Sequence, residues 1–368
     1  MEYFSFFDLI FALILSFVLI TKAKKKRDKF ISTEPAYQFY SKGLAAKLFA
    51  TFLFCSIYLF YYKGGDTLNY YKGIKCFYNV FWKSPSDYFY LLTHGYGLDT
   101  WGIFDHETGR PPKYMFRDSR TLLVLKLSSL LTFPALGGYF TTSILLATIT
   151  YRWVWKSFTF VAERYPTLTS KIALCFLYLP SVIFWGSGIM KDTYTFAASC
   201  YALYACNEIF IKRKNIRNTT IGLLISIYII ISIKAYILFA LLPGILIYLN
   251  FERIAKIKSV FVKVIIFPII TGGLFLAGQG FFMTFGDDFG KYSADRLLEE
   301  AAVQQQDLKR AIYGANSFDI GNFEPTISGV LSKSHLAINA ALFRPYIWEV
   351  GSPTMLLSGV ENSIFFLA

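Results

Sequence analysis

Charged residues are scarce in this sequence. They make up 17% of its 368 residues, while 55% are hydrophobic, and a soluble domain carries about a quarter charged residues. The chain also lacks the HExxH and GxSxG motifs and a phosphate-cradling P-loop, so soluble hydrolases and nucleotide-binding enzymes have no support. Its histidines, His94, His106 and His335, lack metal-ligand spacing. The sequence therefore predicts no metal site built on histidine.

Paired cysteines are absent as well. None of the five cysteines belongs to a CxxC pair, and all but Cys76 lie in apolar runs. This pattern favours small buried side chains over a disulfide or a metal site. No internal repeat and no Gly/Ser linker divides the chain, so we expect one integral membrane domain over 1–368. An apolar run from Met355 reaches the last residue without a polar tail, and we expect the chain to be C-terminally incomplete.

The hydrophobic residues gather in long runs, as they do in membrane-spanning helices. Mean hydropathy is +0.44, and aromatic residues reach 19%. Phe suits lipid-facing positions, and Tyr and Trp collect at the membrane–water boundary. We therefore expect an all-α, polytopic transmembrane helix bundle with broken or re-entrant helices and with amphipathic helices in its periplasmic loops.

The formal net charge of +13 lies mainly in short loops between the apolar runs. This is the positive-inside pattern, in which Lys and Arg stay on the cytoplasmic side of a membrane. It indicates anionic membrane lipids as the partner of these charges and argues against nucleic acid. We expect a multi-pass protein of a bacterial inner (cytoplasmic) membrane.

The first apolar run, 3–20, predicts a retained span with a periplasmic N-terminus. A cluster of Lys and Arg follows it within 22–29, whereas a cleaved signal peptide has its positive end first. The run 48–62 then crosses outward. The mixed, aromatic segment 63–120 becomes an outer loop, for which we expect short amphipathic helices on the outer leaflet.

Basic clusters constrain the later spans. One cluster of Lys and Arg lies within 212–217 and another within 253–263. Both can be cytoplasmic only if the chain crosses the membrane twice between them. We therefore expect a hairpin with Lys234 in its outer turn, although each half is shorter than the roughly 20 residues of a straight span. The alternative is one long span. The remaining predicted spans are 140–155, 172–185, 193–211, 221–233, 236–249 and 264–285.

Two segments do not fit a full crossing. The run 121–133 carries Lys126. Counting the crossings back from the cytoplasmic cluster at 212–217 leaves no full crossing for this run, so we expect it to be re-entrant or interfacial. The segment 286–348 predicts a second outer loop, with an amphipathic helix around 293–313.

The first candidate constellation is Gly64, Gly65 and Asp66 with Tyr70, just after the second span. The glycines allow a sharp turn, which places the Asp66 carboxylate at the membrane boundary. A carboxylate there can act as a general base on a sugar hydroxyl or hold a divalent cation. The alternative is a solvated turn whose aspartate caps a helix.

Two further constellations centre on lysines. Residues 180–192 combine a proline and two glycines with the adjacent pair Lys191 and Asp192. Broken helices in membranes usually line cavities, so Lys191 can bind a phosphate there instead of belonging to an ordinary interfacial turn. Lys234, near Tyr236, lies between two apolar runs, where a cation needs water or an anion. Snorkelling to the outer surface is the alternative for Lys234.

The fourth constellation is Arg344 with Tyr346, Trp348 and Glu349. Arginine offers a planar fork for a phosphate or carboxylate, and the aromatic rings offer surfaces on which sugars stack. The alternative is an aromatic belt with a salt bridge. Glu361 is a further acid within the last apolar run.

Taken in order, four motifs make the chain resemble membrane proteins of bacterial polysaccharide loci. They are GGDTxxYY, PSVIFWGSGIMKD, a lysine with a tyrosine in a short hairpin, and RPYIWE. The resemblance is to polymerases of the Wzy and EpsG type and to the related GT-C glycosyltransferases, and it runs from about Asp66 to Glu349. It implies glycosyl transfer or polymerisation at the periplasmic face, with a polyprenyl-(di)phosphate-linked glycan as substrate. We expect no cofactor apart from the divalent cation that Asp66 can hold.

The resemblance also implies roles for individual residues. Asp66 matches the acid in the first outer loop of GT-C enzymes, although this chain lacks their paired acids there. Arg344 matches the outer-loop arginines of Wzy-type polymerases, and Lys191 and Lys234 would stabilise the departing phosphate. The other substrate-binding candidates are Tyr70, Asp192, Tyr236, Trp348 and Glu349.

Other classes compete with this interpretation. A transporter or a non-catalytic membrane subunit of an export system would use intramembrane charges as a conduction or coupling path. Inverted repeats would favour a transporter, and the sequence has none. An acyltransferase would need a histidine deep in a span, whereas His335 lies in a weakly apolar stretch.

Overall fold

The computed structural model describes residues 4–259 and 321–367, with scattered residues between 261 and 306. The chain divides into two compact units, Met1–Lys256 and Ile257–Ala368. The described residues form helices and loops and no strand, which confirms the all-α prediction. All five cysteines are free, and all but Cys175 are buried, as expected for small core side chains.

The helices of the first unit are α1 (Phe6–Phe30), α2 (Tyr40–Ser56), α3 (Asp66–Lys83), α4 (Pro85–Thr93), α5 (Leu98–Gly102), α6 (Lys113–Arg117), α7 (Ser119–Thr132), α8 (Tyr139–Arg164), α9 (Thr169–Ala173), α10 (Pro180–Trp185), α11 (Lys191–Cys206), α12 (Ile216–Leu249) and α13 (Phe251–Ala255). Short 3₁₀ or π segments extend or join several of them, namely η1 (Pro35–Phe39), η2 (Ile57–Tyr61), η3 (Pro166–Leu168), η4 (Leu174–Tyr178) and η5 (Asn207–Lys212).

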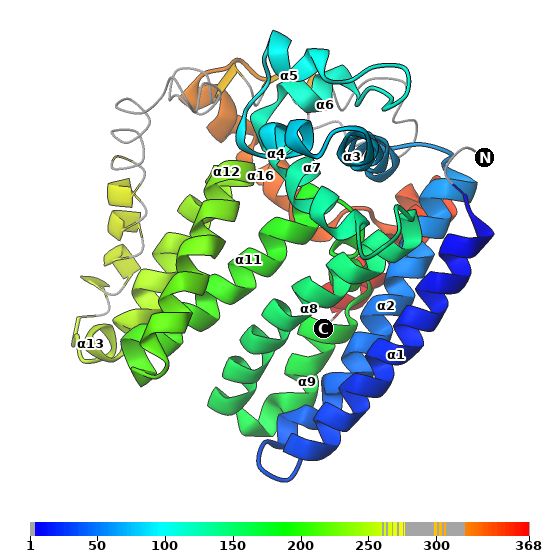
Figure 1. The fold of residues 1–368 in the computed structure, drawn as a ribbon. Helices are drawn as coiled ribbons and strands as arrows, with labels where there is room; N and C mark the ends of the chain where they lie inside the picture. Colours follow the sequence, from blue (N-terminus) through cyan, green and yellow to red (C-terminus); the bar gives the residue numbers. More distant parts are fainter. Residues whose placement is uncertain are drawn as a thin grey trace. The chain divides into compact units, whose positions relative to one another are not determined.

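Helices α1, α2 and α8 pack against one another, and α1 and α2 run in opposite directions (Figure 1). The Asp8 carboxylate of α1 is buried and accepts hydrogen bonds from the amides of Phe140 (2.8 Å) and Thr141 (3.1 Å). These amides belong to the first turn of α8, where amides have no partner within their own helix. An acid of one helix therefore caps the N-terminus of another.

Three helical stretches are long and apolar enough to cross a membrane. Within the described residues they are Phe6–Phe30, Pro35–Tyr61 and Ile216–Leu249. The segments expected to cross at 140–155, 172–185 and 193–211 are helical as well, but their helices are shorter or more polar. Length and composition thus support a membrane protein with three candidate spans.

The segment 63–120 folds into the helices α3 to α6, so the expected helices form, although α3 with 18 residues is not short. Their core is aromatic: Phe104 lies between Phe77 (ring centroids 5.7 Å apart) and Phe116 (5.2 Å apart). All three rings are buried. The segment is therefore a packed layer over the helix ends rather than a solvated linker.

Helix α7, expected to be re-entrant or interfacial, does not run the length of the first unit. It packs along α3. Its first turn carries Thr121, which hydrogen-bonds Tyr70 of α3. The residue after its last turn, Phe133, contacts Tyr78 of α3 at 5.6 Å between ring centroids. Both ends of α7 therefore lie along α3, and its re-entrant or interfacial placement stays a prediction.

The chain is broken between α9 and α11, where the sequence predicts a broken helix. A π-helical segment leads to Pro180, which begins α10. The residues 186–190 that follow are not helical, and Gly186 to Ile189 are buried. Non-helical backbone inside a protein needs hydrogen-bond partners, and those of this segment come from neighbouring helices.

Helix α12 reverses at Lys234, whose backbone is not helical (φ −146°, ψ 74°). Lys234 contacts Asp192 at the start of α11, while Tyr248 near the other end of α12 donates to Asn207 Oδ1 (2.8 Å), just after α11 ends. Ile216, where α12 begins, also follows this end of α11 closely in the chain. A straight helix of 34 residues would be about 51 Å long and could not bring both its ends there. The predicted turn at Lys234 is therefore confirmed.

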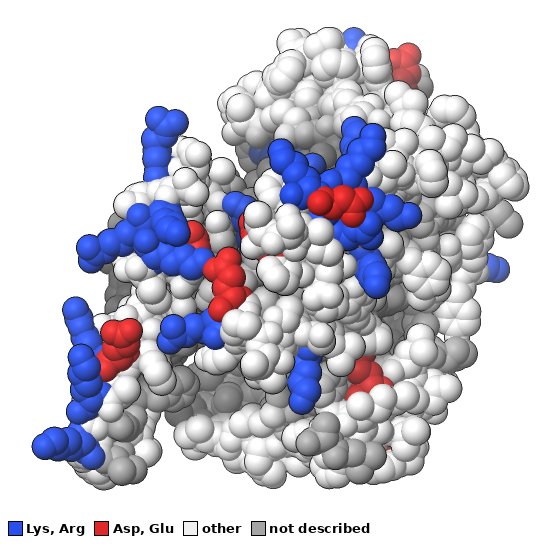
Figure 2. Space-filling view, turned by 90° about the horizontal axis from the view of Figure 1, so that it is seen from below, with Lys and Arg blue, Asp and Glu red and all other residues white. Residues whose placement is uncertain are grey.

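One end of the first unit is basic. The last turns of α1 and α8 and the segments η5 and α13 each carry Lys or Arg. Figure 2, seen from below in the sense of Figure 1, shows Lys and Arg covering more of this face than Asp and Glu. We call this the basic end; α11 ends there and begins at the opposite end.

The second unit contains α16 (Ile327–Phe343), η7 (Ile347–Glu349) and α17 (Pro353–Leu367). The Thr326 side chain begins α16 by accepting a hydrogen bond from the Gly329 amide (3.1 Å). Helix α17 packs against α16 and η7. The helix expected around 293–313 and the span expected over 264–285 lie mostly outside the described residues.

Candidate functional site

Charged and polar residues from four segments meet at the end of the first unit opposite the basic end. Tyr70 lies at their centre, since it hydrogen-bonds Thr121 and is within electrostatic range of three carboxylates. We call this group the Tyr70 site. Its members are Asp66, Tyr70, Asp118, Thr121, Lys191, Asp192 and Lys234.

Helix α3 contributes Asp66 and Tyr70. The turn before it uses two left-handed residues, Lys63 (φ 51°) and Gly65 (φ 102°), and a glycine adopts such a conformation at little cost. Asp66 is then the first residue of α3, where the helix dipole favours a negative charge. Tyr70 follows one turn later on the same face, so the acid and the phenol are neighbours.

Tyr70 carries a neutral hydroxyl in this site. Its side chain is buried, and burial raises the pKa of its hydroxyl; the nearby carboxylates of Asp66, Asp118 and Asp192 raise it further, while the hydrogen bond with Thr121 acts in the opposite direction. The phenol therefore keeps its proton at neutral pH. It can orient a hydroxyl or phosphate oxygen without adding negative charge.

Asp118 joins α7 to α11. It caps α7 by accepting from the Thr121 amide (3.3 Å) and hydroxyl (2.5 Å), and it forms an ion pair with Lys191 (2.9 Å). Burial alone would raise the pKa of the Asp118 carboxyl, but the hydrogen bonds from Thr121 and Lys191 outweigh it and lower the pKa. Asp118 is therefore ionised at neutral pH.

Lys191 and Asp192 are neighbours in the sequence but hold different helices. Lys191 pairs with Asp118 before α7, and Asp192 pairs with Lys234 at the turn of α12 (2.6 Å). The Asp192 side chain is 50% exposed and that of Lys234 22%. The first turn of α11 thus carries one cation and one anion, each bonded to an opposite charge on another segment, at a position open to solvent.

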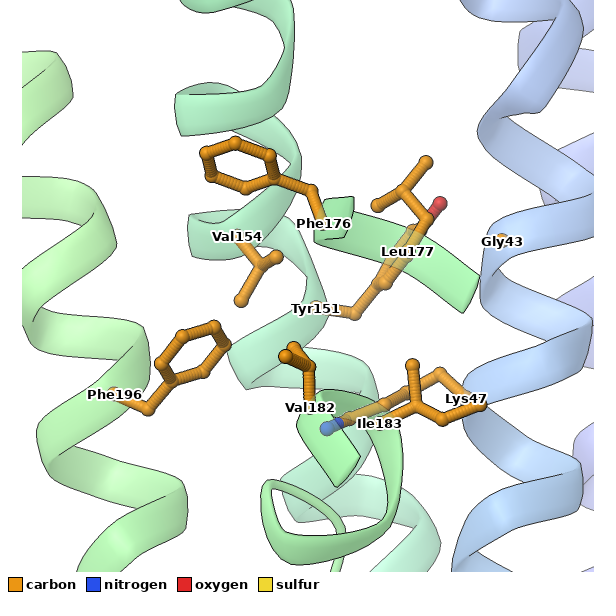
Figure 3. A pocket seen from close by; sticks show the side chains of 9 residues that line it. All are labelled: Gly43, Lys47, Tyr151, Val154, Phe176, Leu177, Val182, Ile183 and Phe196. Atoms are coloured by element: carbon orange, nitrogen blue, oxygen red, sulfur yellow. The ribbon is translucent and has the colours of Figure 1, made fainter. Parts of the chain in front are cut away.

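Lys47 of α2 fixes the broken segment that leads into this turn. Its side chain is 5% exposed, and its Nζ donates to the carbonyl oxygen of Gly186. Figure 3 shows Lys47 reaching toward α10 beside an apolar cavity with room for about one water molecule. Ser187 and Thr193 close the same segment by donating to the carbonyls of Ile183 and Gly188.

The structure brings together six of the residues that the sequence nominates. Asp66, Tyr70, Lys191, Asp192 and Lys234 form the Tyr70 site, and Tyr236, 52% exposed, hydrogen-bonds Lys234. Sequence reasoning missed Asp118, Thr121 and Lys47. Asp118 has a weak local signal, because an aspartate before Ser119 is typical of a helix N-cap; Lys47 has none.

The remaining candidates lie in the second unit. Arg344 forms an ion pair with Glu349 (2.5 Å), and the rings of Tyr346 and Trp348 are stacked at 4.8 Å with an angle of 11° between their planes. Trp348 is 78% exposed. This is the geometry of a salt bridge beside an exposed aromatic platform.

The divalent cation considered for Asp66 has few protein ligands to draw on. In the part of the chain that the structure describes, no three His, Cys, Asp or Glu side chains are grouped as a metal site. An ion such as Mg²⁺ at Asp66 would take most of its ligands from water or from substrate phosphates.

Comparison with known proteins gives no family for this chain: no protein family, curated protein or solved structure matches it.

Proposed function

We propose that the Tyr70 site transfers a sugar from a polyprenyl-phosphate or polyprenyl-diphosphate carrier at the periplasmic face of a bacterial inner membrane. The observation that supports this proposal is the convergence of Asp66, Tyr70, Lys191 and Lys234, from three separate helices, at a broken helix. Such a site offers an acid, a neutral donor and two cations within one region. These are the groups that glycosyl transfer from a phosphate carrier needs.

The two lysines would bind the carrier phosphate. Each is now paired with a carboxylate, Lys191 with Asp118 and Lys234 with Asp192. Partly exposed ion pairs contribute only about 0.2–1 kcal/mol, so an incoming phosphate with one or two negative charges can compete for the ammonium groups. When the carrier departs, the same cations stabilise the charge that develops on its phosphate.

Asp66 would act on the acceptor hydroxyl. It is exposed, and none of the described residues forms an ion pair or a side-chain hydrogen bond with its carboxylate. Tyr114, 61% exposed, lies within electrostatic range of Asp66, and an aromatic face beside an acid suits a carbohydrate. Asp66 can therefore accept the proton of a sugar hydroxyl or orient that hydroxyl for attack.

The membrane orientation follows from charge. Cytoplasmic loops of membrane proteins carry an excess of Lys and Arg, which would place the basic end inside and the Tyr70 site outside. On this proposal α8, α11 and both halves of α12 cross the membrane with α1 and α2. In the second unit, Arg344 offers a charge to a phosphate and Trp348 a stacking surface to a sugar.

Deleting the gene and separating the surface glycans on a gel tests the proposal. A build-up of single repeat units indicates a polymerase, and loss of all product indicates an earlier transferase. Complementation with Asp66→Asn should fail, while Asp87→Asn should restore the wild-type pattern; both acids lie in the first turn of a helix, so helix-end effects are matched. Surface glycans that are unchanged in the deletion strain would contradict the proposal and favour a transporter of another solute.

A further inference from the structure

Three cations meet near the basic end, far from the Tyr70 site. Arg152 and Lys156 are four residues apart on α8 and share one face of the helix. Lys26 of α1 is within electrostatic range of Arg152 and of Lys156. Like charges repel, so the fold holds these three side chains together against their own repulsion.

Aromatic rings support two of these cations. Lys26 Nζ lies 4.8 Å from the ring centre of Tyr40, and Lys156 Nζ lies 4.8 Å from that of Tyr204 and 5.1 Å from that of Tyr201. These distances allow cation–π attraction, which stabilises a cation without neutralising it. The positive charges are held in place and remain available to an anion.

Carboxylates do not neutralise the group. Glu34 and Glu208 are its nearest acids, close to Lys26 and Lys156 respectively. Glu208 already forms an ion pair with Lys212 (3.0 Å). In the described residues no carboxylate forms an ion pair with Lys26, Arg152 or Lys156, so the group has an excess of positive charge.

The position of Arg152 separates this group from an ordinary basic loop. At 1.5 Å per residue it lies about 18 Å along the helix axis from Arg164, the last residue of α8. The positive-inside pattern concerns Lys and Arg in loops and at helix ends. It does not account for an exposed arginine in the middle of a long helix, facing a lysine of the neighbouring helix.

We infer that Lys26, Arg152 and Lys156 bind the phosphate of an anionic lipid headgroup between α1 and α8. The guanidinium of Arg152 offers two parallel donors to phosphate oxygens, and the two ammonium groups add point charges. Basic pockets between membrane helices bind phosphate-bearing headgroups in this way. The inference does not depend on the proposed glycosyl transfer, because the two sites lie at opposite ends of α11.

Thermal unfolding of the purified protein in neutral detergent, followed by tryptophan fluorescence, tests this site. We expect phosphatidylglycerol to raise the melting temperature relative to phosphatidylcholine in the wild type. The rise should be lost in the double variant Arg152→Gln with Lys156→Gln. It should persist in Lys214→Gln with Arg217→Gln, which removes the same charges from exposed positions after α11. Inorganic phosphate at the same concentration distinguishes the two sources of the phosphate. If it does not raise the melting temperature of the wild type, the ligand is a lipid headgroup. If it raises the melting temperature as much as the lipid does, the site recognises the phosphate group alone.

An equal rise in both double variants would overturn the inference. If the α8 variant does not fold, Lys26→Gln replaces it, since this exposed side chain lies on α1 and leaves α8 unchanged. Native mass spectrometry of Lys26→Gln should then show about tenfold weaker retention of phosphatidylglycerol than the wild type, which corresponds to about 1.4 kcal/mol. Undiminished retention in Lys26→Gln would likewise overturn it.

Discussion

Lys234 Nζ lies 2.6 Å from Asp192 Oδ1, and this ion pair joins the turn of α12 to the first turn of α11. The lysine is also the residue with non-helical backbone inside α12. The same residue thus lies at the reversal of α12 and forms part of the Tyr70 site. Its removal should affect stability and chemistry together.

Replacing Lys234 with Met tests the structural part of that role. We expect the free energy of unfolding to fall by about 0.2–1 kcal/mol, the range for a partly exposed ion pair. The exchange of partners, Lys234→Asp with Asp192→Lys, should recover part of the loss. Chemical denaturation in detergent measures both, with Lys214→Met as control. A Lys234→Met variant as stable as the wild type would show that the turn does not need the pair.

Lys47→Met should release the segment 186–190. The substitution keeps a long apolar side chain but removes the bond to the Gly186 carbonyl, and a hydrogen bond to a charged group is worth about 1.5–3 kcal/mol. Cys175→Ser removes the exposed native thiol. In that background, the thiol introduced by Ser187→Cys takes the place of a buried side chain and should react slowly with a water-soluble maleimide. Adding Lys47→Met should raise that rate about tenfold or more. Lys42→Met, an exposed lysine on the same helix, should not, and equal rates in the two backgrounds would contradict the role of Lys47.

Because Asp118 forms an ion pair with Lys191, we expect the stability of the protein to depend on pH in the acidic range. The folded protein lowers the pKa of Asp118 below its ordinary value of 3.8. The ionised carboxylate therefore contributes stability that is fully present above that value and is lost as pH falls through the lowered pKa. Asp118→Asn should be less stable than the wild type at pH 7, and the difference in melting temperature should shrink below pH 3.8. A difference that stays constant across this range would remove Asp118 as its cause.

Variants of Arg344 test whether this residue binds a phosphate or anchors the chain at the membrane interface. If its guanidinium holds a carrier phosphate, Arg344→Lys should lose much of the glycan product while the protein still accumulates in the membrane. Arg344→Ala should be worse, by about 2–4 kcal/mol in the barrier. Since Glu349 is the ionic partner of Arg344, Glu349→Gln is the companion variant and should retain more activity than Arg344→Ala. Full activity of Arg344→Lys at equal abundance would make the residue a structural anchor.

Reporter fusions test the orientation of the first unit. Fusions after Lys29, Arg217 and Lys258 should report cytoplasm, and those after Asp66 and Asp192 should report periplasm. A periplasmic signal at Lys258 would mean that the two halves of α12 do not cross the membrane separately. The whole pattern inverted would place the Tyr70 site inside and would exclude a periplasmic reaction there.

Local sequence signals predicted much of this architecture. Pro180 and the glycines after it marked the break before α11, because such residues cannot continue a helix. Lys234 marked the reversal of α12, because a lysine among apolar residues needs an anion or water. Both predictions depend on only a few neighbouring residues, so they can be made from the sequence without knowledge of the fold.

The partners of those residues could not be predicted in the same way. Asp118 and Lys191 are 73 residues apart in the sequence. No local sequence pattern around either residue predicts that they form an ion pair. Lys47 lies at the edge of an apolar run and is indistinguishable there from a lysine that snorkels to the surface. Only packing decides that it turns inward to the Gly186 carbonyl.

The bond between Asp8 and the start of α8 has a consequence for biosynthesis. The acceptor leaves the ribosome 132 residues before the Phe140 amide that it caps. Helix α8 therefore receives its cap from a helix that was made long before it, while α1 does not depend on this bond to form. During translation the Asp8 carboxylate has no partner until α8 is made, so its charge has to stay in contact with water or another donor during that interval.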